Sequence, residues 1–365
     1  MEKKAYFASI ANLRVIAIMA IILNHSQLGI EADTHYSLTY LIYGQFSKFG
    51  SLLFMIISGF LFEKTISKYT TEQLLYRKTT TILFPSLLFI LPWIILNIGV
   101  LPFIGEQTAV ISKSFIYTEL YNIFFRSIYW FPINLFLILM INSFIRGRRS
   151  LSLLLIPAVL ITIFYSVNIY YHWVPRRHNS AILAFFTFFF AGRLLHIYYP
   201  QVKNIIKNAS RNLFLKLLFC GLSITFFVCA VFESYYIQEN VQGTDPNNIL
   251  RMSNILYTIV FLTFLYGIRN RVDFTKYFAD KTVFLIYLIH PYYLYVGKFL
   301  SGKIIKFGQL HTADYIPLEL AYGTVIFILS VFSARLLLKS PVFNSIISGD
   351  IWVKRAGIEA RQVSG

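Results

Sequence analysis

Residues 10–28 read IANLRVIAIMAIILNHSQL, and this stretch decides the class of fold. Apolar residues dominate it, and its length matches the roughly 20 residues that an α-helix needs to cross a bilayer. Nine more apolar stretches follow, so we predict an all-α integral membrane protein with about ten transmembrane helices. The predicted segments lie near residues 10–28, 45–62, 82–100, 128–145, 151–170, 181–198, 212–232, 251–268, 282–300 and 317–338.

The composition supports lipid as the solvent for much of the chain. Of 365 residues, 57% are apolar and only 13% are charged, against about 25% charged residues in soluble domains. No stretch outside the predicted helices is long enough to fold a core of its own. We therefore predict one transmembrane domain over residues 1–345 and a short cytoplasmic tail over residues 346–365.

The net charge of +17 reflects membrane topology rather than nucleic-acid binding, because the basic residues lie in short gaps between apolar stretches. Cytoplasmic gaps are rich in Lys and Arg, and this bias places both termini in the cytoplasm. The inner gaps then hold most of the cations, such as Arg146, Arg148, Arg149 and Arg193, while the outer side holds few, among them Lys48, Arg176, Arg177, Arg251 and Lys298.

The first predicted helix carries two ionisable residues, Arg14 and His25. Eleven steps of about 100° bring His25 to within about 20° of the Arg14 face, some 16 Å away along the axis. Ionisable groups inside a membrane helix are costly and mark functional sites. Either residue alone could be structural, with Arg14 reaching to the inner surface. Together they favour a function: an arginine suits a phosphate-rich ligand, and a histidine can act as a general base.

Six motifs occur in order from about residue 10 to residue 340. They are the run from Ala11 to His25, Phe54-Met-Ile-Ile-Ser58-Gly59-Phe60, the basic stretch from Arg77-Lys78 to Phe84-Pro85, Tyr129-Trp130-Phe131 with Leu135, Phe189-Phe190-Ala191-Gly192, and Ile286-Tyr287-Leu288-Ile289-His290-Pro291. In this series the chain resembles the acyltransferase family 3 membrane proteins.

The resemblance implies transfer of an acyl group, often acetyl, from cytoplasmic acyl-CoA to a hydroxyl of a cell-envelope glycan or its lipid-linked precursor, at a bacterial cell membrane. The family's arginine and histidine correspond to Arg14 and His25, and His25 would be the base. Arg14, Arg77 and Lys78 are the candidates for binding acyl-CoA. The family commonly has a second arginine three or four residues before the proline, where this chain has Ile82 and Thr81.

Four further residues are candidates for the wall of the active site. His290 and Tyr287 lie three residues apart and share a helix face, either as part of the site or as a structural hydrogen-bonding group. Ser58 either contacts substrate or bonds within its own helix, and Trp130 is either an interfacial anchor or a platform for a sugar ring. The predicted outer loop, HWVPRRH over residues 172–178, suits an acidic glycan or is a solvated connection.

Several kinds of chemistry have no motif here. The seven histidines form no His-x-x-x-His pair for a metal, no nucleotide-binding glycine loop is present, and no Gly-x-Ser-x-Gly elbow supports a serine intermediate. We expect no bound cofactor, with acyl-CoA as a substrate, and direct transfer or a relay of the acyl group through the membrane. The main alternative is a flippase of lipid-linked glycans, which would show broken helices or inverted repeats. Acceptor, acyl length, side of transfer and oligomeric state stay open.

Overall fold

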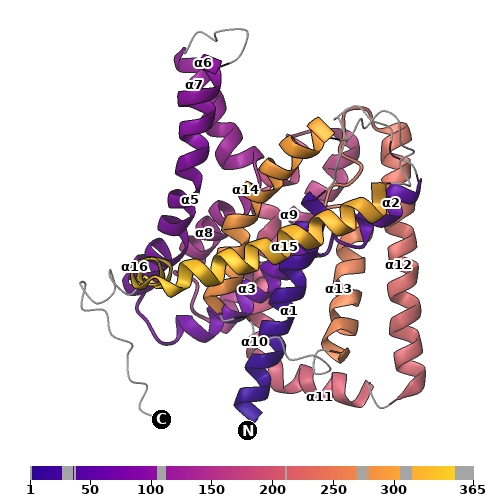
Figure 1. Ribbon diagram of the computed structural model, residues 1–365. Helices are drawn as coiled ribbons and strands as arrows, with labels where there is room; N and C mark the ends of the chain where they lie inside the picture. The colour runs from indigo at the N-terminus through magenta and orange to yellow at the C-terminus, as the bar shows by residue number, and fades with distance from the viewer. Residues whose placement is uncertain are drawn as a thin grey trace. The chain divides into compact units, whose positions relative to one another are not determined.

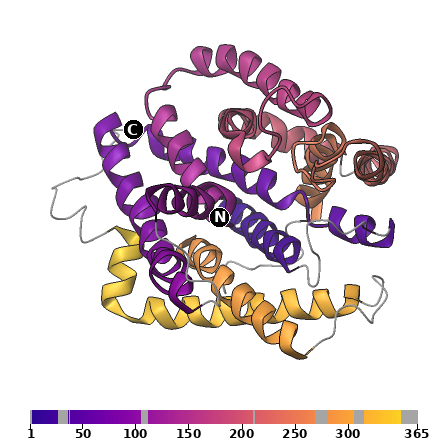
Figure 2. The ribbon, with the colours of Figure 1, turned by 90° about the horizontal axis from the view of Figure 1, so that it is seen from above.

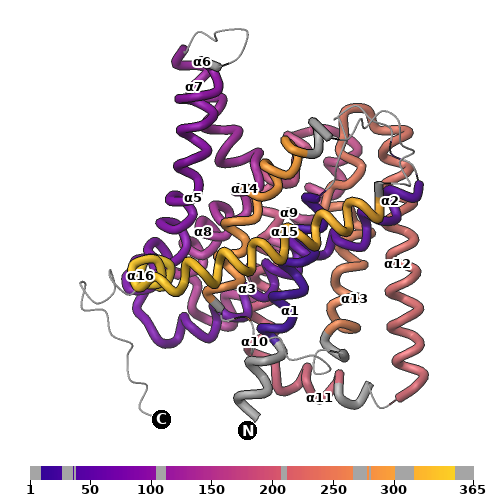
Figure 3. The backbone as a smooth tube through the Cα atoms, viewed as in Figure 1, coloured from indigo at the N-terminus to yellow at the C-terminus, as the bar shows by residue number. Residues whose placement is uncertain are grey.

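The computed structural model describes residues 2–26, 36, 38–104, 112–209, 212–268, 278, 280–304 and 315–349 (Figure 3). Over these residues every regular element is a helix and no strand occurs. The chain divides into two compact units, one made of Met1–Glu63 and Arg148–Arg335, the other of Lys64–Gly147 and Leu336–Gly365. The all-α class predicted from the apolar stretches is confirmed.

The first unit contains most of the long helices (Figure 1). α1 lies beside α14, and α12 packs along α13 (Figures 1 and 2). α3 and α15 begin in this unit and end in the second. The elements that begin here are α1 (Glu2–His25), α2 (Leu38–Gln45), α3 (Gly50–Ile66), α9 (Arg148–Tyr171), the 3₁₀ turns η4 (His178–Ser180) and η5 (Ile182–Phe185), α10 (Phe186–Ile197), α11 (Tyr199–Ala209), α12 (Leu213–Asn240), α13 (Met252–Ile268), α14 (Asp280–Ile304) and α15 (Tyr315–Lys339).

The second unit consists of α-helices interrupted by π-helical turns. Such turns interrupt the regular hydrogen-bond ladder and occur frequently at functional sites. In chain order the elements are α4 (Thr71–Lys78), the π-turn η1 (Thr79–Leu83), α5 (Phe84–Ile94), the π-turn η2 (Ile95–Val100), α6 (Leu101–Ile104), α7 (Lys113–Tyr121), the π-turn η3 (Asn122–Arg126), α8 (Trp130–Asn142) and α16 (Pro341–Ser348).

Each of the ten predicted segments coincides with a helix. Among the described residues, six helices are long and apolar enough to span a membrane, or up to eight when each of two sharply bent helix pairs counts as one span. Ile10–His25 and Met252–Leu265 are shorter apolar helices. Ten crossings and the cytoplasmic position of both termini therefore stay predictions. The predicted tail lies outside the described residues from position 350 onward.

Boundaries differ where local chemistry interrupts a helix. The second predicted segment is one span, Leu38–Ile66, that contains a turn over residues 46–49. The third extends to Phe103 because π-turns let the helix continue past Pro85 and Pro92. The sixth begins with 3₁₀ turns before α10. The short basic turn predicted around Arg146–Arg149 is present, since α8 ends at Asn142 and α9 begins at Arg148.

Apolar side chains cover the outer faces of α9, α12 and α15. In lipid an exposed leucine costs nothing, so these helices are apolar where a soluble protein would be charged. The core of the first unit lies instead along α1, α3, α10 and α14. Examples of the exposed apolar residues are Leu153, Ile156 and Leu160 on α9, Leu217, Ile224 and Phe232 on α12, and Val325, Ile328 and Phe332 on α15.

α3 and α10 cross at two glycines that face each other's backbone. A Cβ on Gly59 would lie 2.1 Å from the carbonyl oxygen of Phe189, and a Cβ on Gly192 would lie 1.9 Å from that of Ile56. Small residues of this kind allow membrane helices to approach closely. Two of the sequence motifs therefore form one helix crossing.

An ion pair lies at the same crossing. Nε of Arg193 donates to Oε2 of Glu63 at 2.6 Å, and the arginine side chain is 1% exposed. The topology argument from charge counted Arg193 among the cations of an inner gap. Arg193 lies within α10, four residues before its last residue, and Glu63 of α3 neutralises its charge, while the side of the membrane on which this end of α10 lies stays a prediction.

Candidate active site

α1 is a continuous α-helix that contains both Arg14 and His25 and ends at His25. The predicted geometry of the two residues therefore holds: they share roughly one face, about 16 Å apart. Both side chains are partly buried. Arg14 has partners of its own in the folded chain. His25 is the last residue of α1.

His290 of α14 faces His25. The two imidazole rings stack, with centroids 6.1 Å apart and planes inclined by 30°. His290 is fully buried, and its Nδ1 lies 2.6 Å from the carbonyl oxygen of Tyr287. A carbonyl can only accept, so Nδ1 carries the hydrogen and Nε2 keeps its lone pair. Nε2 has no hydrogen-bond partner although it is buried, which leaves a basic nitrogen open to a ligand.

An aromatic wall continues from His290. The Tyr287 ring meets the His290 ring edge-on, with centroids 5.2 Å apart. Phe54 of α3 lies on the other side of Tyr287 at a centroid distance of 6.5 Å. Next to His25, Oδ1 of Asn24 is buried without a hydrogen-bond partner. Two unsatisfied polar atoms thus lie beside the paired histidines.

α15 packs against the end of α1. The hydroxyl of Ser26 donates to the carbonyl of Leu23 at 2.8 Å and approaches that of Glu319 at 3.4 Å. A Cβ on Gly323 would lie 2.8 Å from both Cδ2 of Leu23 and Oγ of Ser26. This close contact fixes the position of the helix end from which His25 projects.

Ser58 points its hydroxyl back into its own helix. Oγ donates to the carbonyl oxygen of Phe54 at 2.8 Å. Back-bonding to the residue four positions earlier is common for serine in helices. The geometry favours the structural alternative for Ser58, whereas it brings Tyr287 and His290 together with His25.

Arg77, Lys78 and Trp130 belong to the second unit. The Arg77 guanidinium lies 4.5 Å from the centroid of the Tyr69 ring, and Lys78 ends α4, immediately before η1. Trp130 begins α8, is 5% exposed and packs edge-on against Phe131. These contacts leave open whether the three residues touch substrate, and their site roles stay predictions.

The positions where the family commonly has its second arginine lie in the π-turn η1. The hydroxyl of Thr81 donates to the Arg77 carbonyl at 2.6 Å, and that of Thr80 lies 3.1 Å from the same oxygen. Gly349, in left-handed conformation with φ 68°, follows α16 and packs on these threonines. Thr80 and Thr81 thus stabilise the turn rather than supply a charge.

Arg176 connects two loops through hydrogen bonds. Its guanidinium donates to the carbonyl of Gln242 and to the hydroxyl of Thr244, both at 2.7 Å. Its carbonyl accepts from Nδ2 of Asn248 at 2.9 Å. The loop over residues 172–178 was predicted either to bind an acidic glycan or to be a solvated connection, and Arg176 itself serves to hold two loops together.

His178 lies at the end of the same loop. Burial holds the pKa of this imidazole well below its ordinary value, so the ring is neutral at pH 7. It is within electrostatic range of His25, as are the ammonium groups of Lys48 and Lys298. The sequence analysis named Lys48 only as an outer cation and Asn24 only as part of the first motif, and gave neither residue a role in the site.

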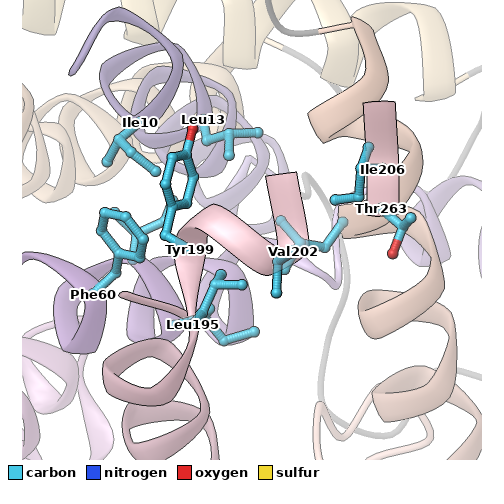
Figure 4. Close-up of a pocket in the computed structure, with 11 residues that line it drawn as sticks. Ile10, Leu13, Phe60, Leu195, Tyr199, Val202, Ile206 and Thr263 are labelled. Carbon is cyan, nitrogen blue, oxygen red and sulfur yellow. The ribbon is translucent and has the colours of Figure 1, made fainter. Parts of the chain in front are cut away.

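A separate cavity of about 110 Å³ opens at the other half of α1. Figure 4 shows Ile10 and Leu13 of α1, Phe60 of α3 and Tyr199 and Val202 of α11 around it. Its lining is almost wholly apolar and holds no charged group. The cavity suits a hydrocarbon chain and contains no candidate base. Among the described residues, no group of three or more His, Cys, Asp or Glu side chains is arranged as metal ligands would be.

Comparison with known proteins identifies the family of the chain. Searches among curated proteins and among solved structures gave no match. The family model described as an acyltransferase domain matches residues 7–337, nearly the whole chain. The match includes both α1, with Arg14 and His25, and α14, with His290. The chain is therefore a multi-pass membrane protein that belongs to acyltransferase family 3.

Proposed function

We propose that this membrane acyltransferase transfers an acyl group, most simply acetyl, from cytoplasmic acyl-CoA to a hydroxyl of a cell-envelope glycan or its lipid-linked precursor. The family supports acyl transfer in a membrane. The observation that carries the finer proposal is the stacked pair of His25 and His290, in which the buried Nε2 of His290 has no partner.

In the proposed step, His25 takes the proton of the acceptor hydroxyl, and the hydroxyl oxygen attacks the carbonyl carbon of the thioester. The C–S bond then breaks as the ester forms, and the departing thiolate of CoA takes the proton from His25. One O–H and one C–S bond are thus exchanged for one C–O and one S–H bond. General-base catalysis of this kind contributes about 10²–10⁴-fold to a rate.

His290 has a supporting role in this proposal. Because its Nδ1–H donates to the Tyr287 carbonyl, its Nε2 can only accept a hydrogen bond. It can accept from the acceptor hydroxyl or from protonated His25, and either bond would orient the proton transfer. Tyr287 fixes this tautomer through its carbonyl and covers the ring from one side.

Arg14 is the proposed phosphate contact for acyl-CoA in the first unit, since a guanidinium matches phosphate geometry. The roughly 16 Å to His25 suits an extended pantetheine arm that reaches along α1. Contacts from Arg77 and Lys78 rest on the motif and on charge alone. The acceptor-wall roles of Ser58 and Trp130 likewise rest on the motifs.

The test uses wild type and His25→Ala in membranes, matched for protein abundance and supplied with labelled acetyl-CoA. Mass spectrometry follows the label into envelope glycans. Wild type should add alkali-labile acetyl groups, and His25→Ala should lose about 10²-fold or more of the rate. Equal labelling by both proteins would show that His25 is not the base, while the proposed acyltransferase activity would stand.

The same membranes separate the flippase alternative. The bends of 76° between Lys113–Arg126 and Trp130–Asn142 and of 85° between α10 and α11 are broken helices of the kind transporters use. If no glycan or lipid-linked sugar gains label while a lipid-linked sugar changes leaflet in a protein-dependent way, the flippase reading replaces acyl transfer to an envelope sugar.

A further inference from the structure

Lys48 is a largely buried lysine for which the described residues provide no hydrogen-bond or ion-pair partner. It lies in the turn between α2 and α3 and is 6% exposed. Within the described part of the chain, its ammonium group makes no hydrogen bond or ion pair. Lysine is almost never buried to this degree unless it is paired, and an intramembrane charge normally has a carboxylate or carbonyl partner.

Helix packing places Lys48 at the His25 end of α1. Gly50, two residues later, packs against the backbone of α1, where a Cβ would lie 3.0 Å from the Ala17 carbonyl oxygen and the Ile21 nitrogen. Further along α3, Phe60 shares a cavity with Ile10. α3 therefore runs antiparallel to α1, and Lys48, before Gly50, lies beyond Ile21 toward His25.

The charges around Lys48 confirm this position. Its ammonium group acts electrostatically on both His25 and His178. It also lies within electrostatic range of Asp245 and Arg251. Lys48 is thus close enough to His25, His178 and Asp245 for their charges to interact.

Neither neighbouring charged group provides a contact. Asp245 is exposed, and its Oδ1 accepts the backbone N–H of Asn247 at 2.8 Å. Arg251 is fully buried and makes four hydrogen bonds. Its guanidinium donates to the Asn248 carbonyl at 3.0 Å and to Oε1 of Gln45 at 2.7 Å, and also to Ala230 and Ser234. Hydrogen-bond acceptors thus surround the guanidinium of Arg251, whereas no described residue provides an acceptor for the ammonium group of Lys48.

We propose that Lys48 binds an anionic group, a phosphate or a carboxylate, on the acceptor whose hydroxyl lies at His25. This inference rests on the proposed acyl transfer and specifies its acceptor class. An ammonium group offers three donors and a full charge, and a bond to a charged group is among the stronger ones in proteins. Neutral His178 can donate or accept one further hydrogen bond at the same end of the site.

The first measurement is binding, which does not depend on acyl transfer. Purified wild type, Lys48→Met, Lys48→Arg and the exposed control Lys216→Met are titrated with inorganic pyrophosphate and with glucuronate, and thermal unfolding is followed. We expect wild type, Lys48→Arg and Lys216→Met to be stabilised by at least one anion. Lys48→Met should need about tenfold to a hundredfold more of it, as expected for loss of a charged hydrogen bond.

The second measurement is the acceptor preference. Membranes receive labelled acetyl-CoA with a uronate-containing oligosaccharide, a polyprenyl-diphosphate-linked neutral oligosaccharide, or the same neutral oligosaccharide free. The ratio of kcat/KM for the preferred anionic acceptor over the neutral one should fall about tenfold or more in Lys48→Met and stay unchanged in Lys216→Met. The acceptor that loses this preference identifies the source of the charge as a carboxylate or a diphosphate.

The outcomes separate the two proposals. Equal anion binding by wild type and Lys48→Met overturns the role of Lys48, whatever the acyl-transfer assay shows. Lys48-dependent anion binding without any acyl transfer keeps the anion site and overturns the proposed function. If Lys48→Met does not fold, Lys48→Gln and Lys48→Arg provide the comparison, and equal anion binding by these two variants overturns the proposal.

Discussion

His25 and His290 differ in how much of their chemistry is set by the fold. The Tyr287 carbonyl determines the tautomer of His290, because it accepts the Nδ1–H at 2.6 Å. His25 lies at the end of α1, partly open to solvent. A partly exposed residue suits proton exchange with substrate, and a fully buried neighbour with a fixed tautomer suits its orientation. This difference supports the proposal that His25 is the base and that His290 has the supporting role.

The pair predicts non-additive losses. His25→Ala should lower the acyl-transfer rate about 10²-fold or more, and His290→Ala about tenfold, because it removes an orienting group rather than the base. The double variant should be no slower than His25→Ala, since residues that act as a unit are not additive. Initial rates with labelled acetyl-CoA measure this, with the exposed Lys216→Ala in α12 as the control.

Two results would contradict this assignment. A larger loss in His290→Ala than in His25→Ala would make His290 the base. Fully multiplicative losses in the double variant would mean that the histidines act independently, despite rings only 6.1 Å apart.

Elements are positioned by glycine where two backbones must touch. Gly59 and Gly192 come from motifs that lie about 130 residues apart. Because each lacks a Cβ, the backbone of the other helix can lie directly against it. The Arg193–Glu63 pair lies at this crossing and holds a charge that lipid would not tolerate alone. The α3–α10 crossing therefore stabilises the part of the fold against which α1 packs.

Alanine at either glycine should weaken this crossing. The added Cβ would meet a backbone oxygen at about 2 Å, which forces the helices apart and costs about 1–3 kcal/mol or more. We expect Gly59→Ala and Gly192→Ala to lower the unfolding temperature in detergent by several degrees. Gly221→Ala in α12 is the matched control, because nothing lies within 4 Å of its added Cβ. An unfolding temperature for Gly59→Ala equal to that of Gly221→Ala would contradict the close approach.

At the scale of the whole molecule, contact with lipid explains why the surface is apolar. Large apolar side chains are exposed along α9, α12 and α15. α3 and α15 each begin in the first unit and end in the second. Basic gaps between the helices then determine which side faces the cytoplasm.

The charge bias predicts that both termini are cytoplasmic. Green fluorescent protein fused after residue 365 should fluoresce in a bacterial host, and alkaline phosphatase at the same point should be inactive, because it folds only outside the cytoplasm. Fusion of the same reporters to a chain truncated after residue 240, between α12 and α13, should give the opposite result. Active phosphatase at the C-terminus would mean an odd number of crossings or an inverted protein.

The sequence by itself determined the all-α membrane class, the positions of the helices and the shared face of Arg14 and His25. These properties are local: a helix needs about 20 apolar residues, and its 3.6-residue period relates positions along one element. The family motifs added the reaction class.

Only the tertiary structure decided which cations are paired and which are not. In the sequence, three basic residues look alike as charges near apolar stretches: Arg193, Arg251 and Lys48. In the structure, Arg193 pairs with Glu63, and Arg251 donates to carbonyl and amide oxygens. Among the described residues, Lys48 has no such partner. The contact of His290 with His25 joins residues 265 positions apart. Pairing depends on the approach of distant helices, and no period or composition within one element contains that information.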